Sequence, residues 1–146
     1  GGFERYLQVV VNMLQQASTT ATAQKLDETE DYDLVDYINQ LREGILDAYT
    51  GILQGLREAN KAQQLLPVVE HILNLIGFTY SDRTTSPEVV RALVGLLGDL
   101  AMAIGSPAKQ LLQQKFVLDI LVECTRNPEP SISQIADWAK TKIGSL

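Results

Sequence analysis

Acidic residues recur at helical spacing between positions 33 and 58, and their pattern indicates a binding surface. At about 100° per residue, Asp36, Gln40, Glu43 and Asp47 project from one side of a helix. The residue four places after Asp36 is Gln40, and the residue four places after Glu43 is Asp47, so no cation at these positions neutralises the row. A solvated surface is the simplest interpretation of such a face. The missing cations favour a surface that receives a basic partner.

The negative charge is concentrated in this part of the chain. Residues 27–58 contain nine acidic residues and two arginines, a net charge of −7, whereas the whole 146-residue chain has a net charge of −6. The remaining residues therefore carry about +1 in total. This distribution argues against DNA or RNA as the main partner and favours a basic protein segment.

The acidic row needs a helix that buries its opposite side. The stretch 33–58 has apolar residues at helical spacing on that side, which predicts one long amphipathic helix with a buried face. They are Leu34, Ile38, Leu41, Ile45, Tyr49, Ile52 and Leu56.

The rest of the chain also shows the helical period, with almost no alternation typical of strands, so the predicted fold class is all-α. Further helices are expected at 3–18, 61–78, 87–104 and 131–143, with one bent helix or a short and a long one between 108 and 127. Polar loops are expected at 19–31 and 79–86. Pro67 suits only a first turn, which places the start of the third helix near residue 66. No apolar run approaches the roughly 20 residues of a membrane span, and no signal sequence is apparent, so we expect a soluble intracellular protein.

Local signals refine two of these helices. Ser86 followed by Pro87 is a strong helix start, and Gly95 and Gly98 inside the same helix are typical of close contact with a neighbouring helix. Val9 and Val11 widen the apolar surface of the first helix, which predicts neighbours on two sides and an apolar face toward whatever precedes it.

The residues most often used in catalysis are isolated. Cys124 lies in an apolar run, which predicts a buried structural thiol, and His71 has no second histidine or cysteine near it in sequence. There is no glycine-rich phosphate loop and no Cys/His set. We therefore expect no enzymatic activity, no catalytic residue, no metal site and no cofactor.

The predicted helices form three pairs, at about 3–58, 61–104 and 107–146. An internal repeat supports this division, because the pattern that begins at Pro87 recurs 43 residues later at Pro130. A period near 40 is typical of HEAT repeats, in which helix pairs stack into a solenoid; a four-helix bundle is the alternative.

With the pairs identified, the chain resembles the C-terminal HEAT repeats of the importin-β family of nuclear import receptors. Four stretches carry the resemblance: YLQVVVNMLQQAS, DYDLVDYINQLREGILDAYTGILQGL, VVRALVGLLGDLAMAIG and IADWAKTKI. The departures lie in the loops at 19–31 and 79–86 and in a shorter, less basic tail after Trp138.

The resemblance implies a superhelix whose second helices line a concave surface that grips the basic importin-β-binding segment of importin-α or other Lys/Arg-rich cargo. It implies a shuttling protein of the cytoplasm, nuclear envelope and nucleus, with Ran and FG-nucleoporins bound mainly by receptor regions absent here. The partner-binding residues it suggests are Asp36, Gln40, Glu43, Asp47, Asp99, Gln134 and Trp138.

Two interpretations stay open. The first concerns the function: the chain either grips a basic partner or is a structural scaffold that makes contacts through its apolar outer faces. The second concerns Trp138, which lies about 100° from the apolar stripe of its helix and should be at least partly exposed. Its indole either covers the open end of the stack or receives Lys and Arg side chains by cation–π contact.

Overall fold

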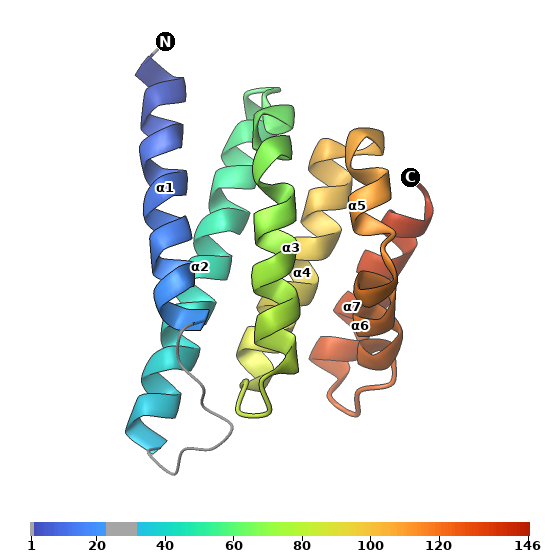
Figure 1. Cartoon of the computed structure of the whole chain (residues 1–146). Coiled ribbons are helices and arrows are strands. Elements are labelled where there is room, and N and C mark those ends of the chain that lie inside the picture. The colour runs from blue at the N-terminus through green and yellow to red at the C-terminus, as the bar shows by residue number, and fades with distance from the viewer. Residues whose placement is uncertain (1, 23–31) are drawn as a thin grey trace.

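The computed structural model describes residues 2–22 and 32–146, and most of these residues lie in helices. No strand occurs among them, so the all-α prediction is confirmed. Two short 3-10 segments, Ala62–Leu65 and Ser106–Ala108, connect longer elements. The α-helices, shown in Figure 1, are α1 (Gly2–Thr22), α2 (Tyr32–Glu58), α3 (Leu66–Ser81), α4 (Pro87–Ile104), α5 (Lys109–Leu112), α6 (Lys115–Thr125) and α7 (Pro130–Gly144).

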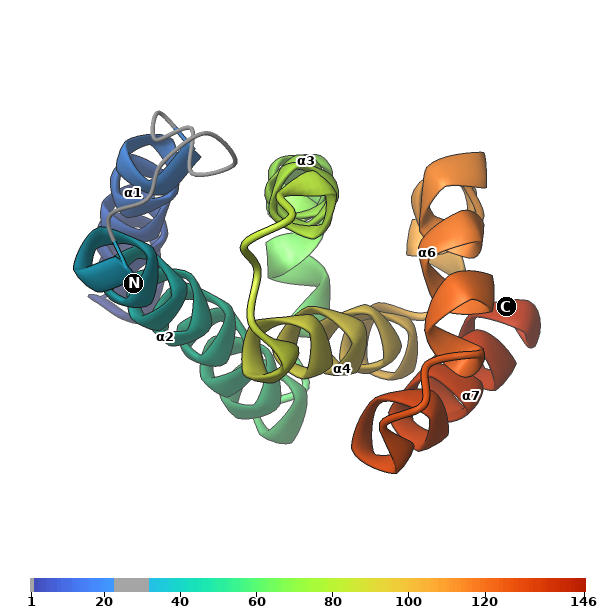
Figure 2. The ribbon, with the colours of Figure 1, turned by 90° about the horizontal axis from the view of Figure 1, so that it is seen from below.

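The helices form antiparallel pairs that stack side by side in two layers. The second members of the pairs, α2, α4 and α7, form an inner layer in which α4 packs against both neighbours (Figure 2). The first members, α1, α3 and α6, form the outer layer. This is the stack expected from the repeat, and it excludes the four-helix bundle, in which these helices would surround one central axis.

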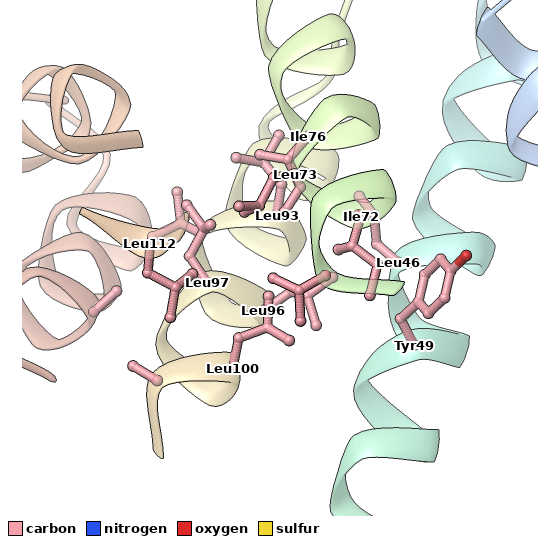
Figure 3. Packing of buried hydrophobic residues seen from close by; sticks show 14 of the residues in the cluster. Leu46, Tyr49, Ile72, Leu73, Ile76, Leu93, Leu96, Leu97, Leu100 and Leu112 are labelled. Carbon is pink, nitrogen blue, oxygen red and sulfur yellow. The ribbon is translucent and has the colours of Figure 1, made fainter. Parts of the chain in front are cut away.

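One continuous core lies between the layers. Figure 3 shows Leu46 of α2, Ile72 of α3 and Leu96 of α4 in the space that the three helices share. Val117 of α6 and Ala139 of α7 belong to the same cluster and are fully buried. Because each helix pair borders its neighbours through this core, no pair buries its apolar face alone.

Local signals set most helix ends. The Ser86 hydroxyl accepts a hydrogen bond of 3.3 Å from the backbone N–H of Val89, which caps α4 as predicted. Pro67 lies in the first turn of α3, and Gly105 ends α4 with a φ of 75°, a conformation that favours glycine.

Two predicted boundaries were wrong, and one alternative left open by the sequence is resolved. The helix predicted at 3–18 continues to Thr22, so only 23–31 of the predicted loop lie outside the described residues. The loop predicted at 79–86 is shorter, because α3 continues to Ser81. Between 108 and 127 the chain forms the short helix and the long one, separated at positions 113–114.

The first helix is only partly open at its outer side. Val9 is 57% exposed and Met13 is 63% exposed, so an apolar surface does face outward there. The outward apolar face does not include Val11, which is 3% exposed and belongs to the core. Because α1 contacts both α2 and α3, the prediction of neighbours on two sides of this helix is confirmed.

A buried ion pair joins α2 to the loop between α3 and α4. Arg42 Nη1 lies 2.8 Å from Asp82 Oδ2, and both side chains are almost inaccessible to solvent. The other carboxylate oxygen of Asp82 accepts hydrogen bonds from the N–H and hydroxyl of Thr84, at 2.9 and 2.7 Å. The Arg42 guanidinium also lies 5.8 Å from the ring centroid of Phe78. Sequence reasoning treated this loop only as polar.

Asn39 adds a second connection between the same two elements. Its side-chain amide donates to the backbone oxygen of Thr84 at 2.9 Å, and its side-chain oxygen accepts from the N–H of Ser86 at 2.9 Å. These bonds hold Ser86, the N-cap residue of α4, against α2. The inner layer is therefore fixed by polar contacts at one end and by apolar packing along its length.

Candidate partner-binding surface

A groove of about 280 Å³ opens where α2, α4 and α7 meet. Its charged lining consists of Glu43 and Asp47 from α2 and of Glu88, Arg91 and Asp99 from α4. The remaining lining residues are Thr50, Ala92, Gly95, Leu96 and Ile135. Residues from all three repeats thus meet at one site, and three of the seven predicted residues lie in it.

The groove is electrostatically unbalanced. Four carboxylates and one guanidinium line it, and the charge of Arg42 does not reach it because that residue is buried against Asp82. The Asp99 carboxyl group is half-buried, and this burial raises its pKa above the ordinary value, while the positive charge of Arg57 partly offsets the shift. A carboxylate that is poorly hydrated gains more from an incoming cation than a fully solvated one. The groove can therefore attract and hold positively charged side chains.

Trp138 lies beside the groove and packs against α4. Its ring faces Gly98 so closely that a Cβ atom at position 98 would lie 2.2 Å from Trp138 Cζ3. The side chain is half-buried, so the prediction of partial exposure is confirmed. The structure gives no support to a cap over the open end, because the indole fills the gap that Gly98 leaves between α7 and α4.

A similar but looser contact lies one helical turn away. A Cβ atom at Gly95 would be 3.1 Å from Ile135 Cδ1 of α7. The two glycines of α4 therefore face Ile135 and Trp138, which are themselves one turn apart on α7. The interpretation of Gly98 as a position of close helix contact is confirmed.

The other predicted residues lie outside the groove lining. Asp36 and Gln40 are exposed on the first half of α2, and Gln134 is exposed on α7 immediately before Ile135. They share the inner layer with the groove without entering it, so their part in binding stays a prediction.

A second hollow, of about 320 Å³, lies at the N-terminal ends of α4 and α7. Pro87, Glu88, Arg91, Glu129 and Ser131 line it. Sequence reasoning named none of these as site residues, although the repeat superposes Pro87 on Pro130 and so predicts that the two helices begin side by side. Glu88 and Arg91 border both hollows and form the ridge between them.

Residues suited to catalysis or metal binding are few and isolated in the described part of the chain. No three His, Cys, Asp or Glu side chains there are grouped so that they could hold a metal ion. Cys124 is buried as predicted, its thiol lies 3.8 Å from the Tyr80 hydroxyl, and burial raises the pKa of the thiol. Within residues 2–22 and 32–146, no helix combines the length and apolar character needed to cross a membrane.

Comparison with known proteins identifies the family. The family described as "Importin subunit beta-1-like, TPR repeats" matches residues 1–125. Importin subunit beta-1 of Arabidopsis thaliana is 34% identical over 142 residues, and that of Schizosaccharomyces pombe is 31% identical over 146 residues. Each alignment covers 97% of this chain and 16% of the relative, so the chain spans about one sixth of their length.

The fold agrees with this match. A crystal structure of importin beta in a polyethylene glycol condition superposes with a TM-score of 0.84 and 33% identity, over 99% of this chain and 17% of that one. The HEAT-repeat solenoid predicted from the sequence is therefore confirmed. The relatives are importin subunits by name. The chain belongs to the importin subunit beta-1-like family.

Proposed function

We propose that this chain is a protein-binding module of a nuclear import receptor, and that its inner layer grips a Lys/Arg-rich helix. The observation that carries the proposal is the groove in which Glu43, Asp47, Glu88 and Asp99 converge from two neighbouring repeats. The basic importin-β-binding segment of an importin-α adaptor has the matching charge. Such a receptor shuttles between cytoplasm and nucleus, and it meets Ran and FG-nucleoporins mainly through regions outside this chain.

The binding energy of such a surface comes from many weak contacts. Exposed ion pairs contribute about 0.2 to 1 kcal/mol each, so a groove with four carboxylates needs further contacts for stable binding. Asp36, Gln40 and Gln134 extend the polar surface beyond the groove, and Trp138 offers the exposed part of its ring to the stem of a lysine or arginine. Salt should weaken the complex, because it screens exposed charges and the steering they provide.

The test is charge reversal inside and outside the groove. We expect Glu43→Lys with Asp47→Lys to weaken binding of a labelled importin-β-binding peptide by at least tenfold in a fluorescence anisotropy titration, on the basis of about 1.4 kcal/mol per factor of ten. Glu70→Lys with Asp119→Lys changes the net charge equally on the outer-layer helices α3 and α6. Glu129 is unsuitable as a control, since it lines the neighbouring hollow. Equal effects of the two double variants would leave only nonspecific attraction and refute the groove.

The alternative is a structural scaffold that makes contacts through its apolar outer faces. The exposed Val9 and Met13 on α1 favour it, because they offer apolar surface without charge. Ligand charge separates the two functions. A scaffold predicts that binding survives the groove reversal and high salt but fails when Val9 and Met13 are both replaced by serine.

A further inference from the structure

Arg91 is the one cation among the described residues that line the two hollows of the inner layer. Its side chain is exposed and lines both the groove between α2, α4 and α7 and the hollow at the N-terminal ends of α4 and α7. Glu43, Asp47 and Asp99 lie on one side of it, and Glu129 lies on the other. The surface that a basic helix would meet therefore consists of two acidic hollows with a positive charge between them.

The charge of Arg91 is not neutralised by an ion pair within the described part of the chain. No side chain there forms an ion pair or a hydrogen bond with its guanidinium. Glu88, three residues earlier on the same helix, borders the same two hollows and is its nearest carboxylate along α4. The ridge is therefore close to neutral or positive, in contrast to the hollows on both sides.

A cation at this place acts on a basic ligand selectively. A lysine that faces either hollow is attracted by its carboxylates, whereas a lysine that faces Arg91 is repelled by the guanidinium. Repulsive contacts of this kind distinguish correct from incorrect alignments of the same ligand. The acidic residues attract a basic helix at almost any alignment, so a residue of a different kind must set the register of the bound helix.

We propose that Arg91 sets the register of the bound helix by requiring a non-basic, preferably acidic, ligand residue opposite the ridge. This inference rests on the proposed function, because it assumes that a Lys/Arg-rich helix occupies the inner layer. It adds a specificity-determining residue to that function and predicts a ligand with two basic clusters separated by one neutral or acidic position.

The experiment is a charge scan on a designed probe. The probe is a fluorescein-labelled helical peptide with a stripe of five lysines, accompanied by five variants in which a single lysine is replaced by glutamate. With the wild-type protein, we expect replacement at one position to strengthen binding by about twofold to fivefold, the size of one exposed charge pair, and replacement at the other positions to weaken it. With Arg91→Glu, that one position should become as unfavourable as the others, and Arg91→Gln should lie between.

Controls separate this inference from the proposed function. Lys109→Glu on α5 makes the same charge change at an exposed position outside both hollows and should keep the wild-type scan profile. Circular dichroism of the Arg91 variants checks that the helices persist. Identical scan profiles for Arg91→Glu and Lys109→Glu would overturn the role of Arg91 while leaving the groove intact. If the lysine peptide binds the wild-type protein no better than a glutamine-stripe peptide does, the proposed function fails, and the role of Arg91 fails with it.

Discussion

The buried pair of Arg42 and Asp82 gives the sharpest stability prediction. Arg42→Met removes the cation while keeping a flexible apolar stem in the same place. The Asp82 carboxylate would then stay buried, retaining the two hydrogen bonds from Thr84 but lacking the guanidinium at 2.8 Å. A buried charge that has lost its partner is strongly unfavourable, because water does not replace the lost contact.

The expected cost follows from that burial. Removing one member of a buried ion pair typically costs about 3 to 5 kcal/mol, and the remaining Thr84 contacts favour a value near 3. For a domain of this size, each kcal/mol lowers the melting temperature by about 2 to 4 °C. A loss of about 3 kcal/mol therefore corresponds to a decrease of about 6 to 12 °C in the melting temperature of Arg42→Met. Asp82→Asn should cost a similar amount, since it removes the negative charge that lies 2.8 Å from Arg42 Nη1.

Urea unfolding measures the change in free energy directly, provided that the slope with denaturant stays constant. Lys115→Met is the matched control, because Lys115 and Asp119 form an ion pair of 3.2 Å whose side chains are 91% and 63% exposed. That variant should cost less than about 1 kcal/mol. Losses of equal size for Arg42→Met and Lys115→Met would refute the reasoning that burial gives the Arg42 pair its weight.

Two further predictions concern the inner layer. Gly98→Ala gains helix propensity of about 1 kcal/mol but places a methyl group where the Trp138 ring lies, so we expect a net loss of stability and a shift of the tryptophan fluorescence; Gly51→Ala, whose added methyl group meets nothing within 4 Å, should instead stabilise slightly. Asp99→Asn should weaken binding of a basic peptide yet leave stability at pH 7 unchanged or raised. Burial raises the pKa of Asp99 in the folded protein, so the folded state binds more protons, and the contribution of this group to stability falls as pH rises above about 3.8. Asparagine does not titrate, so the stability of Asp99→Asn relative to the wild type should increase as pH rises from about 3.5 to 7 in thermal unfolding. An equal pH profile for the two proteins would contradict the assignment.

Features determined by neighbouring residues were predictable from the sequence. The helix at 87–104 was predicted with its correct ends because Ser86, Pro87 and Gly105 each act within one turn of their own position. The position of α2 followed from its apolar stripe in the same way. The repeat added the arrangement in space, since superposing Pro87 on Pro130 places α4 and α7 side by side.

Features that depend on distant pairs were not predictable. Arg42 and Asp82 are 40 residues apart, and nothing near either residue indicates that they meet inside the protein. The packing of Trp138 was not predictable for the same reason, because it depends on the missing side chain of Gly98, which is distant in sequence and lies on another helix. The helical wheel placed the ring correctly on the flank of α7, but only the structure shows that this flank faces α4.

The groove and the packing of the inner layer have a common origin in α4. Gly95 and Ala92 are small, so α7 approaches α4 closely enough for Ile135 to reach the backbone, and the space above these small side chains forms part of the groove. Larger residues at the same positions would separate the two helices and fill the hollow between Asp99 of α4 and Glu43 of α2. Because a solenoid transmits such a shift from each repeat only to its neighbours, the approach of α7 to α4 is set locally by these small residues. The small residues of α4 therefore allow the close stacking of α7 and keep open the hollow bordered by the carboxylates that we propose a basic helix must match.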